Sequence, residues 1–353
     1  MDTNAWQEIA RVTRSGSSES RHLGRAALVD PSGRRCWILG DPERPVWLRS
    51  AVKPFQALPF VALGLLDRHG LDDGHLVLLC ASHSGEDGQR RLVAEILAAL
   101  GLDEGALRCG YRRPFDGEAM RRKIREGLPD SPLYHPCSGK HAGMLGLNMA
   151  LGGGAADYDA PDAPAQRLIA GVVGAFAGVP EPEPGLDGCG VPTFRLPLSG
   201  LALAFARLVA GALPPGLPRP DLPWAAAMRR TTLAMAARPD LLGGRRRRLD
   251  SAIVKATRGA VIAKDGMEGV ECLALRGPGL GLAVKIRDGS PRPLGPFCCA
   301  ALSRLGILDD QAAAALAGWR EGAQATSGGQ RTGSVEVPDA ALPPGPPGEA
   351  PPA

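Results

Sequence analysis

Strand-like segments occur near both ends of this chain, and helical segments fill its middle. Residues 24–40 read GRAALVDPSGRRCWILG, two apolar runs around an Asp-Pro-Ser-Gly turn, which predicts a β-hairpin. Residues 259–266, 270–276 and 280–288 alternate with Gly-rich turns, as in a β-meander. We therefore predict an α/β fold of the α+β type, in which an antiparallel sheet is built from both termini and covered by helices.

Apolar periodicity predicts where those helices lie. Residues 89–101, QRRLVAEILAALG, carry leucine, isoleucine and valine at helical spacing before a terminating glycine. Residues 75–82, HLVLLCAS, form a short apolar run that fits either a buried strand or the end of a buried helix. Further helices are predicted from near Ser50 and over residues 199–212, 223–237, 297–305 and 310–319.

Composition indicates a globular protein with less ordered ends. The chain has 353 residues, of which 44% are hydrophobic and 22% charged, as in ordinary soluble domains. We predict a flexible amino-terminal segment over residues 1–18, a single folded domain over 19–336 and a disordered Pro-rich tail over 337–353.

The sequence also limits the compartment and the partners that we expect. The amino-terminal residues lack the basic and apolar regions of a secretory signal, so we expect a cytoplasmic protein whose eight cysteines stay reduced. No apolar stretch is long enough to cross a bilayer. The net charge is +4, and the basic run RRRR (245–248) is interpreted as a solvated loop. Neither nucleic acid nor a membrane is therefore an expected partner.

The stretch LRSAVKPFQ (48–56) places Ser50 and Lys53 three residues apart, on one face of a helix. A lysine made neutral by burial can accept the proton of a nearby serine, which would make the serine a nucleophile. The motif alone is weak, because serine and lysine often meet at this spacing by chance. The simpler interpretation is a helix start with Lys53 in solvent.

Four more stretches keep reactive side chains among glycines and small residues. These are CASHSGE (80–86), HPCSGKHAGM (135–144), LDGCG (186–190) and AKDGMEG (263–269). Their candidate residues are Ser82, His83, Ser84, His135, Cys137, Ser138, Lys140, His141, Asp187, Cys189, Lys264 and Glu268. Each has a plain structural alternative, such as a strand end, a core histidine or an exposed turn. The cysteines also lack a C-x-x-C partner.

The order of Ser-x-x-Lys, Ser-x-Ser and a strand lysine loosely resembles the penicillin-recognising Ser/Lys acyl enzymes. A closer resemblance is to the asparaginase II family, the rhizobial-type L-asparaginases, and it runs from about Glu19 to about Gly333. It is carried by ESRHLGRAALVD, GDPERPVWLRSAVKPFQALP, CASHSGE, CSGKHAGML, LDGCGVPTF and AKDGMEGV. Within these, SAVKPFQALP and CSGKHAGM are the most specific parts.

This resemblance implies a homodimeric amidohydrolase with a serine β-lactamase and glutaminase-like fold, two Ser-Lys pairs and a zinc site. The implied catalytic residues are Ser50, Lys53, Ser82 and Lys264, with Ser50 as our expected nucleophile. The implied zinc ligands are Cys137, Lys140 and Cys189. The chain departs from the family pattern at Pro136, where we expect asparagine, and at Ser251, where we expect threonine.

The expected substrate is a small amino-acid amide, L-asparagine, hydrolysed to L-aspartate and ammonia. Its charged α-groups need partners that fix its orientation. We expect Arg49 to bind the carboxylate and Asp187 the ammonium group, and the remaining substrate-site candidates are His83, His141 and Glu268. The alternatives are a related amidase or glutaminase, a β-lactam-type acyl enzyme, and a non-catalytic binding protein on the same fold.

Overall fold

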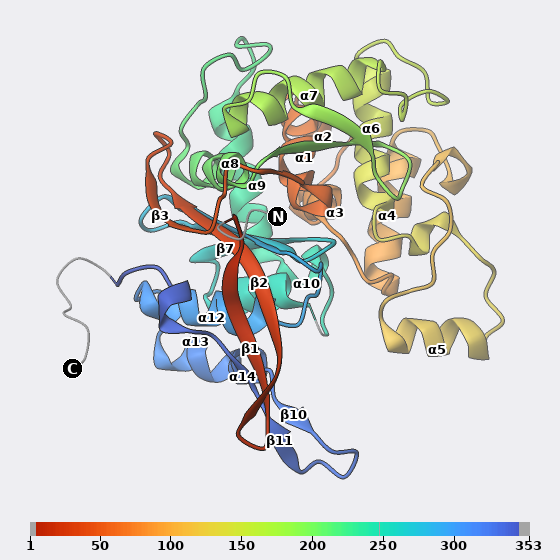
Figure 1. The fold of residues 1–353 in the computed structure, drawn as a ribbon. Coiled ribbons are helices and arrows are strands. Elements are labelled where there is room, and N and C mark those ends of the chain that lie inside the picture. Colours follow the sequence, from red (N-terminus) through yellow and green to blue (C-terminus); the bar gives the residue numbers. More distant parts are fainter. Residues whose placement is uncertain (1–4, 247, 346–353) are drawn as a thin grey trace.

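A computed structural model describes residues 5–246 and 248–345 of the chain (Figure 1). In this part of the chain, seven strands form one sheet. Six of them follow the order β12 (Val335–Glu336), β1 (Gln7–Arg14), β2 (Ser17–Val29), β9 (Leu280–Ile286), β8 (Val270–Leu275) and β7 (Val261–Gly266), and β3 (Arg35–Leu39) pairs with β2.

All pairings in this sheet are antiparallel, and the sheet joins the two ends of the sequence. Strand β1 pairs with β12 through Arg11 opposite Glu336, and β2 pairs with β9 through Ala27 opposite Ala283. The predicted hairpin is β2–β3, and the predicted meander is β7–β8–β9. The mixed α/β fold, with an antiparallel sheet drawn from both ends, is therefore confirmed.

Both predicted chain ends are more ordered than expected. The prediction of a flexible segment over residues 1–18 is wrong for its described part, because β1 and the start of β2 occupy it and Ile9 is fully buried. The predicted disorder of 337–353 is wrong for residues 337–345, where a 3-10 turn, η5 (Asp339–Ala341), buries Ala341 against the core. Residues 1–4 and 346–353 lie outside the described residues.

The middle of the chain is helical, as predicted, and HLVLLCAS belongs to a helix rather than a strand. The first half contains α1 (Lys53–Ala62), α2 (Leu65–Arg68), α3 (Asp73–Cys80), α4 (Asp87–Ala99), α5 (Gly117–Arg125), α6 (Ser138–Ala150) and α7 (Pro164–Ala177). The second half contains α8 (Leu198–Ala210), α9 (Trp224–Ala237), α10 (Pro239–Leu242), α11 (Leu249–Ala256), α12 (Leu294–Arg304), α13 (Asp310–Ala315) and α14 (Ala317–Glu321). Short 3-10 turns are η2 (Arg49–Val52), η3 (Glu104–Ala106) and η4 (Pro132–Tyr134).

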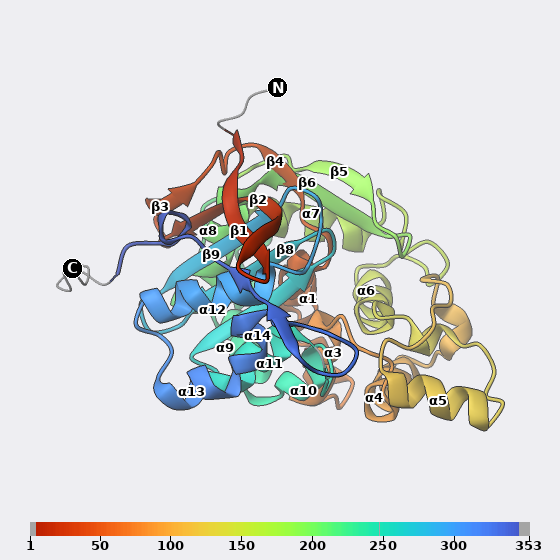
Figure 2. The ribbon, with the colours of Figure 1, turned by 60° about the horizontal axis from the view of Figure 1, so that its bottom comes forward.

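Helices cover the sheet and surround a central helix. Helix α8 packs against β9 so closely that a side chain at Gly281 would lie 1.9 Å from the carbonyl oxygen of Ala202. Every residue of α1 is buried, and α1 contacts α3, α6, α7 and α9. Figure 2 shows α12, α13 and α14 gathered on one side of the molecule, whereas α4, α5 and α6 lie at the opposite end. None of the helices in the described ranges is both long and apolar enough to cross a membrane.

A second, small sheet positions the segments that matter for function. Its strands follow the order β4 (Pro45–Trp47), β6 (Pro192–Pro197) and β5 (Glu183–Leu186), while β10 (Gln324–Ala325) and β11 (Arg331–Gly333) form a separate pair. The backbone N–H of Leu48 donates to the carbonyl of Phe194 at 3.0 Å, which extends the contact beyond β4. The η2 turn after β4 is thereby held beside the β5–β6 turn, residues 187–191.

Candidate active site

A pocket lies where η2, the loops before α4 and α6, the β5–β6 turn and the end of β7 meet. Ser50 and Ser82 both line it, together with Cys137, Asp187 and Cys189. The complete lining is Arg49, Ser50, Ser82, Arg112, Phe115, His135, Pro136, Cys137, Asp187, Gly188, Cys189, Arg248, Asp265 and Met267. The pocket therefore contains residues from all five stretches singled out in the sequence, and Asp265 represents AKDGMEG (263–269).

Two buried lysines contact one serine of this pocket. The Ser82 hydroxyl oxygen lies 3.1 Å from Lys53 Nζ and 3.1 Å from Lys264 Nζ. Lys53 Nζ also donates to the carbonyls of Ala81 at 2.5 Å and Pro136 at 3.2 Å. Among the described residues, Lys53 thus bonds to Ser82 rather than to Ser50, its predicted partner.

The local backbone explains why Ser50 and Lys53 do not pair directly. Ser50 lies in a 3-10 turn, and Lys53 is the first residue of the α-helix that follows, so the two do not share one regular helix. Arg49, directly before Ser50, has a φ of 50°, a left-handed conformation that is uncommon for a residue with a side chain. Such strained positions concentrate at functional sites.

The two lysines lie in opposite electrostatic surroundings. Lys53 is fully buried, and no carboxylate contacts it among the described residues. Burial lowers its pKa, and the charges of Lys140 and Lys264 lower it further. Lys264 is equally buried, but it contacts the carboxylate of Asp265 and lies 3.5 Å from Asp250 Oδ2. Lys53 is therefore suited to accept a proton, whereas Lys264 is held between two acidic side chains.

Arg248 connects the two sides of this site, so the interpretation of residues 245–248 as a solvated loop is wrong at its last position. Its Nη1 donates to the carbonyl of Ser82 at 2.6 Å, and its Nη2 lies 2.8 Å from Asp265 Oδ2. The Arg248 side chain is only 13% exposed, since Asp265 and Asp250 offset its charge. Arg247 lies outside the described residues.

One more buried carboxyl group lies in this charged network. Glu271, on β8 opposite Asp265, is 1% exposed, and neither of its oxygens has a hydrogen-bond partner among the described residues. Burial raises the pKa of Glu271 well above its ordinary value, and the charges of Asp250 and Asp265 raise it further. Its surroundings therefore favour the protonated, neutral form of Glu271.

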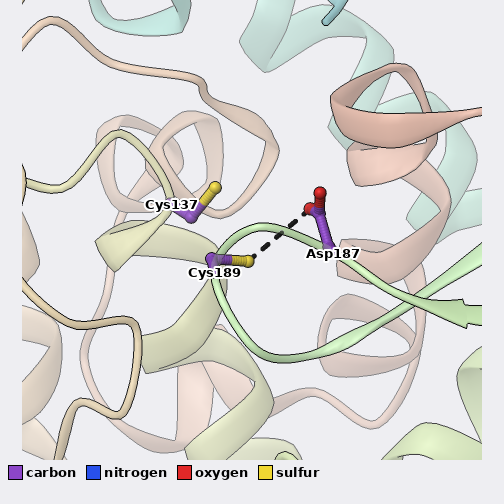
Figure 3. A group of neighbouring side chains, drawn as sticks. All are labelled: Cys137, Asp187 and Cys189. Atoms are coloured by element: carbon purple, nitrogen blue, oxygen red, sulfur yellow. Dashed lines mark hydrogen bonds between the residues drawn. The ribbon is translucent and has the colours of Figure 1, made fainter.

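A second cluster, at the other end of the pocket, combines thiols and a carboxylate. Figure 3 shows Cys137, from the loop before α6, facing Asp187 and Cys189, which both come from the β5–β6 turn. The Cys189 thiol donates to Asp187 Oδ2 at 3.6 Å (Figure 3). Asp187 also pairs with Arg49 at 2.9 Å and with Lys140 at 3.0 Å.

The charges in this cluster depend on one another. Burial alone would raise the pKa of Asp187, but Lys140 and Arg49 hold it below its ordinary value. The hydrogen bond with Cys189 and the charges of Lys53 and Lys140 lower the pKa of Cys137 despite its burial. Burial opposes the charge of Lys140, yet the two cysteines and Asp187 raise its pKa. Without a metal, Lys140 is therefore a charged partner of Asp187.

The donor atoms of this cluster fit a metal ion. One ligand atom each from Cys137, Asp187 and Cys189 lies within 4.8 Å of the other two, and all three residues are buried. Thiolates and a carboxylate are suitable zinc ligands, and zinc prefers four of them in a tetrahedron. Asp187 thus joins the predicted ligands Cys137 and Cys189, while Lys140 would have to lose its proton to bind.

Three predicted substrate-site residues do not line the pocket. His83 and His141 are fully buried behind it, with His83 Nε2 2.8 Å from Ser138 Oγ and His141 Nδ1 2.7 Å from the Tyr158 hydroxyl. Burial lowers the pKa of each histidine to about 3, so both rings are neutral. Glu268 is exposed in the β7–β8 turn and lines a different hollow.

The pocket also contains side chains that the sequence reasoning did not assign to the site. These are Arg112, Phe115, Pro136, Gly188, Arg248, Asp265 and Met267, together with His135, which carried no predicted role. Asp265, Pro136 and Gly188 lie within the stretches singled out in the sequence, so their positions could have indicated that they belong to the site. Arg112 and Phe115 come from a loop before α5 that has no recognisable motif.

Hydrolases that form covalent acyl intermediates use a hydroxyl nucleophile activated by a nearby base, such as a buried lysine. Comparison with protein families agrees with this class. The model of the L-asparaginase II family matches residues 10–337, nearly the whole chain. The chain therefore belongs to the L-asparaginase II family, a family of amidohydrolase enzymes.

The chain is similar to individual solved structures at low sequence identity. No curated protein matches the chain. Among solved structures, Mglu in its native form in the presence of 4.3 M NaCl is 17% identical, with a TM-score of 0.42 over 79% of this chain and 60% of that chain. Mglu in its glutamate form is also 17% identical, with a TM-score of 0.36 over 81% of this chain and 61% of that chain. The chain thus spans about three fifths of the length of these Mglu chains.

Proposed function

We propose that this protein hydrolyses L-asparagine to L-aspartate and ammonia through a Ser-Lys acyl-enzyme mechanism. The observation that carries the proposal is the position of the Ser82 hydroxyl, 3.1 Å from both Lys53 Nζ and Lys264 Nζ at the wall of the pocket. Membership of the L-asparaginase II family supports an amino-acid amide as the substrate.

Ser50 is the proposed nucleophile, because it lines the pocket and follows the strained backbone of Arg49. Its oxygen attacks the side-chain amide carbon, and its proton passes to Ser82 while the Ser82 proton passes to neutral Lys53. The C–N bond then breaks, and the same route returns a proton to the nitrogen, which leaves as ammonia. Water next attacks the ester on Ser50, releasing L-aspartate and restoring the hydroxyl.

Lys264 supports this sequence by positioning Ser82. Its contacts with Asp265 and Asp250 anchor its side chain, and its hydrogen bond to Ser82 orients the hydroxyl between the two lysines. The lysines therefore divide the work, with Lys53 moving protons and Lys264 holding Ser82 in place.

A zinc ion is part of the proposal. Cys137 and Cys189 would hold it, with Asp187 or a deprotonated Lys140 completing the protein ligands. When bound, such an ion supplies a Lewis acid that polarises a carbonyl oxygen or orients the substrate.

The decisive experiment measures ammonia release and identifies the acylated residue. Wild-type protein should release ammonia from L-asparagine, with glutamine slower by about 10- to 200-fold because of its extra methylene group. Ser50→Ala should lower kcat by about 1,000-fold or more and prevent any acyl adduct. Ser82→Ala should slow turnover yet leave the adduct on Ser50, detected by peptide mass spectrometry after acid quenching.

The matched control is Ser84→Ala, because Ser84 lies in the same loop but its hydroxyl donates to the Gly243 carbonyl and not to a lysine. Ser84→Ala should retain most of the turnover. An adduct on Ser82 would reverse the roles of the two serines. No ammonia from L-asparagine in a folded, zinc-loaded preparation would refute the proposed function.

A further inference from the structure

Among the described residues, three arginines line the pocket, and two of them are already paired with its carboxylates. Arg49 Nε lies 2.9 Å from Asp187, and Arg248 Nη2 lies 2.8 Å from Asp265. Each carboxylate also contacts a buried lysine, since Asp187 pairs with Lys140 and Asp265 with Lys264. Each of these two carboxylates is therefore paired with two cationic side chains, which offset its negative charge.

Arg112 is the third arginine, and it differs from the other two. Within residues 5–246 and 248–345, it forms no ion pair with any carboxylate. Its guanidinium carbon lies 5.0 Å from the ring centre of Phe115, which also lines the pocket. A guanidinium group over an aromatic ring is held in place while its N–H donors stay available for an anion.

The loop that carries Arg112 is fixed to the segment that carries Ser82. The backbone N–H of Asp116 donates to the Ser84 carbonyl at 3.0 Å. A side chain at Gly85 would lie 3.2 Å from Pro114 Cβ, so the two segments approach closely there. The position of the Arg112 loop relative to the reactive serine is therefore set by direct backbone contacts.

We propose that Arg112 binds the α-carboxylate of the amino-acid substrate and so sets the preference for free amino-acid amides. This assignment rests on the proposed function and replaces Arg49, whose Nε is bound to Asp187. A guanidinium group accepts a carboxylate through two parallel N–H donors, which fixes orientation as well as charge. An unpaired cation at the wall of a pocket also attracts anionic groups.

The test uses ligand pairs that differ only in the α-carboxylate. L-aspartate, the proposed product, becomes β-alanine when this group is removed, and L-asparagine becomes β-alaninamide. Calorimetry should show L-aspartate binding weakened by about 10- to 100-fold in Arg112→Ala, the range for a lost hydrogen-bonded charge. Competition by β-alanine should be the same in the variant as in the wild type.

Arg113→Ala is the matched control, because Arg113 is an exposed neighbour that does not line the pocket. It should bind L-aspartate as the wild type does. Arg112→Lys keeps the charge without the paired donors and should fall between wild type and Arg112→Ala.

Kinetics provide the second measurement. Arg112→Ala should raise KM for L-asparagine about 10-fold or more, with a smaller change in kcat. Wild-type affinity for L-aspartate in folded Arg112→Ala, or equal losses for L-aspartate and β-alanine, would overturn the role of Arg112. Such a result is distinct from failure of the proposed function, in which the wild type itself releases no ammonia from L-asparagine.

Discussion

Lys53 and Lys264 reach the same hydroxyl, that of Ser82, at the same distance of 3.1 Å, yet within the described residues only Lys264 has carboxylate partners. A buried ammonium group without a counter-charge loses its proton readily, whereas one beside carboxylates keeps it. Two identical side chains thereby obtain different chemical roles from their surroundings.

Substitution of each lysine by methionine should separate these roles. Lys53→Met should reduce kcat by about 100-fold or more, because it removes the proposed base. Its effect on stability should be small, about 1 kcal/mol, since only hydrogen bonds are lost. Lys264→Met should destabilise the protein by roughly 3–5 kcal/mol, because the buried carboxylates lose a counter-charge. Urea unfolding and ammonia release measure the two effects, and equal destabilisation by both substitutions would contradict the assignment.

The pH dependence of the wild type should carry the signature of Lys53. Its pKa in the folded protein is lowered, so the unfolded chain binds more protons between that pKa and the ordinary lysine value. Lys53 therefore contributes a rise in stability as pH increases through this window. Activity should likewise fall on the acid side as the base becomes protonated. Lys53→Met should remove that part of the stability slope, which unfolding at several pH values would reveal.

Arg248 should matter far more than its neighbours in the basic run. Arg248→Met leaves the buried Asp265 and Asp250 with Lys264 as their remaining cationic partner and should destabilise the protein by roughly 3–5 kcal/mol. Arg246→Met is the matched control, because Arg246 is 64% exposed and pairs with Glu118 at the surface. Its effect should stay within about 0.5 kcal/mol. Thermal unfolding of the two variants compares them directly, and similar shifts would contradict the structural role of Arg248.

Glu271 should make the stability of the folded protein fall as pH rises above the ordinary glutamate pKa. Its pKa is raised in the folded state, so its contribution to stability is complete below the ordinary glutamate pKa. That contribution is lost as pH rises through the raised value. Glu271→Gln does not titrate and should therefore gain stability relative to the wild type as pH rises from about 4 to about 8. A constant difference between the two proteins over this range would show that Glu271 does not hold a proton.

Metal analysis should find one zinc ion per chain in protein purified without added zinc. Cys137→Ser and Cys189→Ser should each lose it, since both remove a thiolate ligand from a site with few donors. Cys36→Ser should retain it, because Cys36 is on β3, outside the cluster. Mass spectrometry of the intact protein and elemental analysis measure occupancy. Equal zinc content in all variants would exclude the cysteine cluster as the site.

Patterns confined to neighbouring residues were predicted well from the sequence. The hairpin of residues 24–40 and the meander after residue 259 both show strand-like runs punctuated by turn residues, and both are present. The family motifs also indicated most of the pocket. Ser50, Ser82, Cys137, Asp187 and Cys189 all line it, although they come from separate parts of the chain.

Features that depend on distant partners were missed. The residues of β1 are largely polar, so this segment alone does not indicate a strand. Its edge partner, β12, lies more than 300 positions later in the sequence. Arg248 looks solvated within RRRR, because the carboxylate of Asp265 that offsets its charge arrives from another strand. The bond from Lys53 to Ser82 depends on how α1 meets the loop after α3, which spacing within one motif cannot encode.

The adjacency of β1 and β12 has a consequence for synthesis on the ribosome. Residues 7–14 are made more than 300 residues before their edge partner at residues 335–336. Likewise β2, at residues 17–29, waits for β9 at residues 280–286 before its inner edge is covered. The nascent chain therefore carries unpaired strand edges while the residues between these partners are synthesised, a state in which proteins are prone to aggregate and to need chaperones.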